Sequence, residues 1–150
     1  KKKKFGKLDF KKFHPAGNLG NQLKTAADLM LTKNKIPFVK ENTPMKKALR
    51  ILNRKKLGFL VVINNQGFNS GIFTDGDLKR LMQRKKSIDN LKIKRFITKN
   101  PYIVEENALA SDILKQMNKR KITGVCVYNK KNKKRTIGVI HIHNLLNVLK

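Results

Sequence analysis

The sequence lacks long hydrophobic runs, has no tryptophan and contains one cysteine. Because no apolar run approaches the roughly 20 residues that span a bilayer, we expect no transmembrane helix. The basic start of the chain has no apolar stretch of the kind found in a secretion signal. Cys126 cannot form an internal disulfide, and its place in the apolar run GVCVY predicts a buried thiol in a reducing compartment. These absences together predict a cytoplasmic protein.

Acidic residues are also scarce, with 9 aspartates and glutamates against 36 lysines and arginines, a formal net charge of +27. A charge of this size first suggests a nucleic-acid partner. Few of the basic residues are arginine, the side chain best shaped for phosphate and guanine, and the lysines are spread along nearly every segment. We therefore expect salt-sensitive, nonspecific attraction to polyanions and no specific nucleic-acid binding.

What the chain does contain is an internal repeat. The stretches ALRILNRKKLGFLVVINN and SDILKQMNKRKITGVCVYN follow one plan, in which Leu49 aligns with Leu114. In each stretch apolar residues at helical spacing are followed by a basic cluster and then by a β-branched, strand-like run. Each repeat, over about residues 28–84 and 95–149, is predicted to form a strand, a helix, a two-stranded hairpin and a second helix.

These repeats predict the α/β class, with two small sheets that pack on each other because one repeat has too small a core. We expect a lead-in at residues 1–23, a first repeat at 24–90 and a second repeat at 91–150. In the first repeat, Thr43 is placed to cap a helix whose first turn suits Pro44.

Two of the few acidic residues lie in the stretch GIFTDGDL, where a strand is predicted to become a helix. One interpretation is a capping box, in which Thr74 and Asp77 satisfy each other's backbone and Asp75 lies in the positive first turn. The other is an anion site at a helix N-terminus, with Thr74 on a phosphate and Asp77 on ribose hydroxyls. The two interpretations compete for one carboxylate.

The repeat together with GIFTDGDL resembles a CBS domain pair, also called a Bateman module, over roughly residues 24–150. The resemblance implies an adenosine-nucleotide site between the repeats, in which the threonine and aspartate of the motif hold phosphate and ribose. It implies further that Asp75 belongs to this site and that the base lies near Val39, Gly58 and Phe59. A regulatory, nucleotide-binding domain would be the function.

A narrower resemblance is to the C-terminal part of bacterial D-arabinose 5-phosphate isomerases, which carry a sugar-isomerase (SIS) domain ahead of a CBS pair. The stretches that support it, in order, are FHPAGNLG, ADLM, IPFV, KKLGFLVVI, GIFTDGDLKR, KRKITGV and GVIHIHNLL. The implied parent enzyme interconverts ribulose 5-phosphate and arabinose 5-phosphate for synthesis of the lipopolysaccharide sugar Kdo. In it, His14 of the HPxG motif would serve as an acid–base group; this region alone would not be an enzyme.

By the same resemblance the regulatory ligand would be AMP, ATP or the nucleotide-sugar CMP-Kdo, and no cofactor would be required. The CBS pair would form a homodimer, within a tetramer of the parent enzyme. The rival hypothesis is a ligand-free module that only assembles subunits. In that case the threonine and aspartate of the motif act purely as helix caps.

The second repeat departs from the nucleotide pattern. His141 and Asn144 stand where threonine and aspartate would fall, and His143 and Thr123 complete the candidate residues of that repeat. Because asparagine brings no charge, at most one strong nucleotide site is expected. The two histidines would point the same way on a strand, but a zinc site usually needs three or four ligands, so we predict no metal.

Two basic clusters, at residues 54–56 and 119–121, end equivalent predicted helices. Basic side chains stabilise the negative C-terminus of a helix, which is sufficient reason for their presence. They could also help to neutralise the phosphates of a ligand, and both interpretations remain open at this point.

Overall fold

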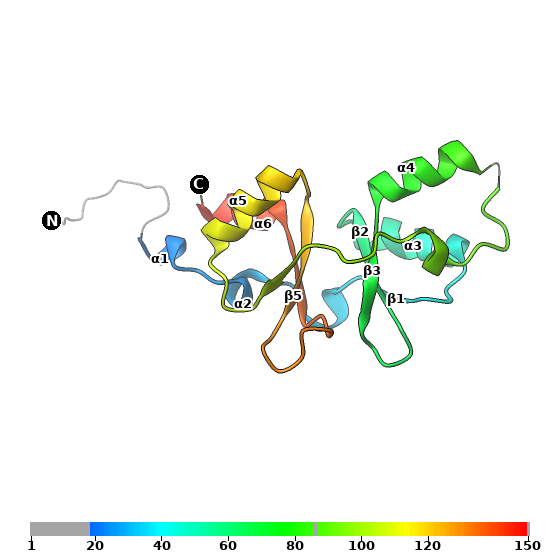
Figure 1. Cartoon of the computed structure of the whole chain (residues 1–150). Coiled ribbons are helices and arrows are strands. Elements are labelled where there is room, and N and C mark those ends of the chain that lie inside the picture. Colours follow the sequence, from blue (N-terminus) through cyan, green and yellow to red (C-terminus); the bar gives the residue numbers. More distant parts are fainter. Residues whose placement is uncertain (1–18, 86, 150) are drawn as a thin grey trace, which may run out of the picture.

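The fold consists of two three-stranded sheets, seen in a computed structural model that describes residues 19–85 and 87–149. In each sheet the first and middle strands are parallel, and the middle and last strands form an antiparallel hairpin (Figure 1). The α/β class and the element order of the repeat are therefore confirmed. The strands are β1 (Phe38–Lys40), β2 (Phe59–Ile63) and β3 (Asn69–Thr74) in the first sheet, and β4 (Ile103–Glu105), β5 (Gly124–Tyr128) and β6 (Gly138–His141) in the second.

Two helices accompany each sheet, and the two halves of the molecule lie side by side in Figure 1. Short helices precede the first strand, and a 3-10 turn precedes the first strand of each sheet. The helices are α1 (Leu19–Gln22), α2 (Ala26–Leu29), α3 (Met45–Lys55), α4 (Asp75–Arg84), α5 (Ala110–Arg120) and α6 (Ile142–Leu149), and the 3-10 turns are Lys33–Lys35 and Ile93–Phe96.

The start of α3 differs from the expectation. Pro44, rather than Thr43, occupies the N-cap position, and no side chain caps the helix. The backbone N–H of Met45 instead donates to the carbonyl oxygen of Leu91 at 2.8 Å. The prediction that Thr43 caps this helix was wrong because a connecting segment from later in the chain satisfies the helix start.

The apolar runs predict middle strands from Leu57 and from Ile122, but β2 and β5 each begin two residues later. Lys56 and Lys121 end α3 and α5 in the left-handed conformation, with φ of 59° and 57°. Gly58 follows with φ of +79°. The chain therefore turns sharply after each helix before it can extend into β2 or β5, which shortens both strands.

A shared core joins the two sheets, as the repeat predicted. Each repeat has its own buried cluster. A third cluster, with Ile36, Phe59, Val61, Cys126 and Val139 at its centre, takes residues from both repeats. The close contact between the two sheets depends on Gly124, because a Cβ atom at this position would lie 2.3 Å from the ring of Phe59. Burial of these apolar side chains is what holds the two halves together.

The segment that precedes each repeat in the sequence packs against the other repeat. Ala26, ahead of the first repeat's strands, is buried in the core cluster of the second repeat. Ile93, ahead of the second repeat's strands, is buried in the cluster of the first. The two segments also extend the opposite sheets through the isolated bridges Leu31↔Val139 and Ile72↔Thr98. The spatial halves therefore differ from a simple division of the sequence.

Candidate functional site

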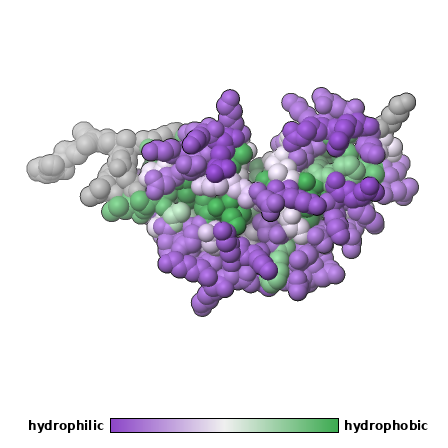
Figure 2. Space-filling model, viewed as in Figure 1, coloured by the Kyte–Doolittle hydropathy of each residue, from purple (hydrophilic) through white to green (hydrophobic). Residues whose placement is uncertain are grey.

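A cleft of about 510 Å³ lies between the two repeats. Its walls come from the β3–α4 junction at residues 74–76, from the linker at residues 98–102 and from the loop at residues 120–124 ahead of β5. In Figure 2 it opens as a notch between the two upper lobes, which correspond to the region between α5 and α4 in Figure 1. Parts of both repeats are needed to form it.

The junction on one wall of this cleft is a capping box. Thr74 Oγ1 accepts a hydrogen bond from the backbone N–H of Asp77 at 3.1 Å, and Asp77 Oδ2 accepts one from the backbone N–H of Thr74 at 2.9 Å. The two side chains therefore satisfy N–H groups that the first turn of α4 cannot pair internally. The structure shows the capping geometry predicted for this motif.

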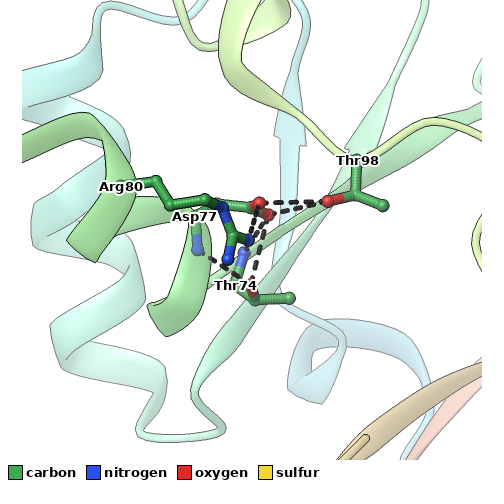
Figure 3. Close-up of polar contacts among 4 residues, drawn as sticks. All are labelled: Thr74, Asp77, Arg80 and Thr98. Carbon is green, nitrogen blue, oxygen red and sulfur yellow. Dashed lines mark hydrogen bonds and ion pairs between the residues drawn. The ribbon is translucent and has the colours of Figure 1, made fainter. Parts of the chain in front are cut away.

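The Asp77 carboxylate has further partners on both sides (Figure 3). Arg80 Nη2 donates to Oδ1 at 2.7 Å, and Thr98 Oγ1 donates to Oδ1 and Oδ2 at 3.0 and 3.1 Å. Only 8% of the Asp77 side chain is exposed, against 64% for Arg80. The buried charge is thus fully compensated, and Asp77 lies behind residues 74–76 without lining the cleft itself. A ribose hydroxyl could reach the carboxylate only by replacing one of these partners.

The other residues predicted for this site fall in different places. Gly58 and Phe59 line the cleft, and so does Asp75. Asp75 Oδ2 lies 3.2 Å from the position that a Cβ atom on Gly58 would take, so the glycine leaves room for the carboxylate. Val39 is only 4% exposed, belongs to the core of the first repeat and does not line this cleft.

The sequence interpretation missed an aromatic side chain in the cleft. Tyr102 lines the wall that the linker supplies, and Arg120 lies over its ring with Cζ 4.2 Å from the centroid. Arg120 belongs to one of the two basic clusters noted in the sequence, and Lys121 beside it also lines the cleft. The sequence did contain a signal for this contact, because an aromatic residue follows Pro101 directly ahead of the second repeat's first strand.

The equivalent junction of the second repeat keeps the cap without the charge. Asn144 Oδ1 accepts a hydrogen bond from the backbone N–H of His141 at 3.2 Å, as Asp77 does for Thr74. The rings of His141 and His143 are stacked with centroids 4.8 Å apart, and the backbone N–H of His143 donates to Nδ1 of His141.

Burial, together with the nearby His143, lowers the pKa of His141 below its ordinary value of 6.5. The fourth candidate of this repeat, Thr123, lines the cleft between the repeats, and its backbone carbonyl oxygen accepts a hydrogen bond from the backbone N–H of Ile142, between the two histidines, at 2.8 Å. Thr123 therefore contacts the start of α6 and also faces the cleft.

Within residues 19–85 and 87–149 no group of three or more histidine, cysteine, aspartate or glutamate side chains is placed to hold a metal ion. None of the helices in this part of the chain is long and apolar enough to cross a membrane. His14 lies outside the described residues.

Two stacked repeats with a cleft between them define a tandem α/β repeat module. The chain belongs to the CBS domain family, whose sequence profile matches residues 26–84 and 93–150. The match covers both repeats, so the chain holds a tandem CBS pair.

Curated relatives include sugar-phosphate isomerases. The chain is 36% identical over 143 residues to the arabinose 5-phosphate isomerase KdsD of Yersinia pestis, covering 95% of the chain and 43% of that protein. It is 36% identical over 139 residues to KdsD of Escherichia coli K12, with 92% and 42% covered. An uncharacterised protein of Rickettsia prowazekii is 33% identical over 147 residues, with 96% and 44% covered. The chain thus spans less than half the length of these relatives.

Solved structures of CBS pairs share the fold. The pair of protein MJ0100, in complex with 5′-methylthioadenosine and S-adenosyl-L-methionine, superposes with a TM-score of 0.73 at 19% identity, covering 84% of this chain and 95% of that one. CBSX2 of Arabidopsis thaliana in complex with AMP gives 0.69 at 24% identity, with 82% and 93% covered. At these identities the likeness establishes the fold alone.

Proposed function

We propose that this CBS pair is a regulatory domain that binds an adenosine nucleotide in the cleft between its repeats. The observation that supports the proposal is the position of the GIFTDGDL junction, whose residues 74–76 form one wall of an open cleft of about 510 Å³. This volume lies within the roughly 300–1,000 Å³ typical of ligand sites. Solved CBS pairs of the same fold in complex with AMP, ATP and S-adenosyl-L-methionine favour the same class of ligand.

The phosphate end of the ligand would lie at the N-terminus of α4. There the helix dipole is positive, and the Thr74 hydroxyl can donate once its own cap contacts are rearranged. Arg120 and Lys121 also line the cleft and supply positive charge. The apolar wall at Ile72, together with the Tyr102 ring, would hold the base. In this arrangement Arg120 must leave the ring of Tyr102 before a base can stack there.

The ribose would bind the Asp77 carboxylate in exchange for an internal partner. Arg80 is the easier partner to replace, because its side chain is largely exposed and can move into water. Thr98 is different, since it belongs to the linker that forms another wall of the cleft. A ligand that replaces the hydrogen bond between Thr98 and Asp77 therefore alters the contact between α4 and the linker. Binding would in this way change the structure.

We propose further that the chain forms the C-terminal part of an arabinose 5-phosphate isomerase. The support is 36% identity to KdsD over nearly the whole chain, which matches 43% of that enzyme's length. The regulatory ligand would be AMP, ATP or the nucleotide-sugar CMP-Kdo, and His14 would act only in the complete enzyme. A cytoplasmic location, a homodimer through the CBS pair and a tetrameric enzyme belong to the same proposal.

The test is a thermal-shift titration with AMP, ATP and CMP-Kdo at about 0.3 M NaCl, where nonspecific attraction to the basic chain is screened. A ligand that binds only the folded state must raise the melting temperature. Asp77→Asn keeps an acceptor for the helix cap but removes the charge, so the variant should fold and lose the response to nucleotide. Asp112→Asn, an exposed acid in the first turn of α5, is the matched control and should respond like the parent chain.

An equal response in the parent chain and in Asp77→Asn would contradict a ribose role for this carboxylate. A ligand-free scaffold is the second candidate function, and the complete set of internal partners around Asp77 favours it. It predicts that no nucleotide changes the melting temperature while light scattering still shows a stable oligomer.

A further inference from the structure

A second cavity, of about 450 Å³, lies on the other side of the linker from the nucleotide cleft. The residues Asn100 and Pro101 line both cavities, so this dipeptide is the wall between them. No residue of the GIFTDGDL junction lines the second cavity, which is formed by the start of β3, by the linker, by β4 and by the β5–β6 hairpin. We propose that it binds a small organic phosphate, distinct from the nucleotide of the first cleft.

The charge of the lining favours an anion. Lys133 and Lys134 line the cavity, and no aspartate or glutamate does. Within the described part of the chain neither lysine pairs with a carboxylate: the ammonium of Lys133 lies 5.7 Å from the Tyr128 ring centroid, and that of Lys134 lies 5.8 Å from the Phe68 ring centroid. Two unpaired ammonium groups at one cavity suit a dianionic phosphate monoester.

The floor of the cavity is polar and held in place. Thr136 is only 7% exposed, and its hydroxyl accepts a hydrogen bond from Asn69 Nδ2 at 2.9 Å. Asn69 Oδ1 in turn accepts from the backbone N–H of Gly71 at 2.7 Å. The floor therefore has a fixed shape before any ligand arrives, which reduces the entropy lost on binding.

The two hairpins that flank the cavity are tied together. The backbone N–H of Asn69 donates to the carbonyl oxygen of Lys134 at 2.8 Å, and Arg135 Nη2 donates to the carbonyl oxygen of Gln66 at 3.1 Å. In Figure 1 the β2–β3 and β5–β6 hairpins accordingly lie side by side at the same end of the molecule. These contacts keep the wall from the first repeat against the lysines of the second.

The remaining lining suits the organic part of the ligand. Pro101, Ile103 and the Tyr128 ring supply an apolar surface on which a carbon skeleton can lie. The side-chain amide of Asn100 makes no hydrogen bond within the described residues and can bind a hydroxyl of the ligand. Inorganic phosphate uses the lysines alone, whereas an ester with hydroxyl groups also uses these surfaces.

The proposal can be tested with ribose 5-phosphate and inorganic phosphate as probes, by calorimetry and by NMR at about 0.3 M NaCl. Ribose 5-phosphate should bind saturably and more tightly than inorganic phosphate, and should shift the amide signals of Val127, Tyr128 and Thr136. Lys133→Gln/Lys134→Gln should weaken this binding about tenfold or more, because two charge-assisted contacts are lost.

The matched control is Lys130→Gln/Lys131→Gln, which removes the same charge from the same hairpin at residues that do not line the cavity. It should leave the affinity nearly unchanged. Equal loss in both double variants, signal shifts spread over the whole surface, or no saturable binding of ribose 5-phosphate would each overturn the proposal. AMP binding is measured on the same variants, and its presence or absence decides the nucleotide proposal separately because Asp77 is intact in both.

Discussion

Thr98 donates a hydrogen bond to the carboxylate of Asp77, 21 positions earlier in the chain. This contact joins the linker between the repeats to the first turn of α4, and Figure 3 shows both residues together with Arg80. The same carboxylate is the group that a ribose would need. The helix cap, the linker and the proposed ligand therefore depend on one side chain.

Thr98→Val should lower the free energy of unfolding by about 1.5–3 kcal/mol, because a hydrogen bond to a buried charge is lost. Urea denaturation followed by circular dichroism measures this change. Thr32→Val is the matched control, since Thr32 opens the similar stretch TKN but makes no side-chain cap. A loss equal to that of the control would mean that the Asp77–Thr98 contact does not contribute to stability.

Arg80→Gln should increase the affinity for adenosine several-fold, because the ribose then has one competitor fewer for Asp77. Adenosine is the correct probe here, since it carries no phosphate whose binding would fall when a positive charge is removed. Arg84→Gln, one turn further along α4 and without contact to Asp77, should leave the affinity unchanged. Calorimetry on both variants decides the prediction, and weaker binding by Arg80→Gln would show that Arg80 assists the ligand.

Gly124→Ala should destabilise the contact between the repeats by about 1–3 kcal/mol, as overpacked cores generally do. The added Cβ atom would lie 2.3 Å from the ring of Phe59, so the ring or the strand must move. Phe59→Leu in the same chain should restore part of the lost stability. Thermal unfolding of the two single variants and the double variant tests this, and strictly additive losses would contradict direct contact.

The stability of the chain should fall as the pH drops below about 6.5, in part because of His141. Its pKa is lowered in the folded state, so the unfolded chain binds this proton more tightly. The stabilising effect of neutral His141 is therefore present above pH 6.5 and is lost as the pH falls through the folded-state pKa. His141→Thr, which introduces the residue found at the equivalent position 74 of the first repeat, should flatten this part of the pH profile measured by urea unfolding.

Cys126 should resist thiol reagents in the folded chain. Burial raises the pKa of its thiol to about 12, and the side chain is 1% exposed. Because the thiolate is the reactive form, Ellman's reagent at pH 8 should react only when the chain unfolds. Rapid labelling under native conditions, faster than global unfolding, would show that the β4–β6 sheet opens locally.

The fold could be predicted because each repeat carries its own periodic signals. Helical spacing around Leu49 and Leu114, followed by β-branched runs, indicated the order of helix and strands in both repeats. The shared core could be predicted because one repeat alone is too small to bury a sufficient core. The exchange of segments could not be predicted from the sequence. Local patterns show that Ala26 and Ile93 are apolar, but they do not show that each is buried in the core of the opposite repeat.

Only the part of the candidate site that depends on local sequence could be predicted. The capping box at Thr74 and Asp77 depends on residues three apart, so its geometry follows from the sequence. The contacts of Asp77 with Thr98 and of Tyr102 with Arg120 bring together residues far apart in the chain. Val39 was assigned to the base by resemblance alone, and the parallel pairing of β1 with β2 places it in the core.

The exchange of segments also determines how this module would be connected to other parts of a longer protein. The α1–α2 segment contacts α5, α6 and β6, all in the second repeat, before the chain crosses to build the first. A catalytic domain joined ahead of residue 19 would thus be attached mechanically to the second repeat. Any displacement of one repeat against the other would reach that domain through α2, by a route that bypasses the first repeat's sheet.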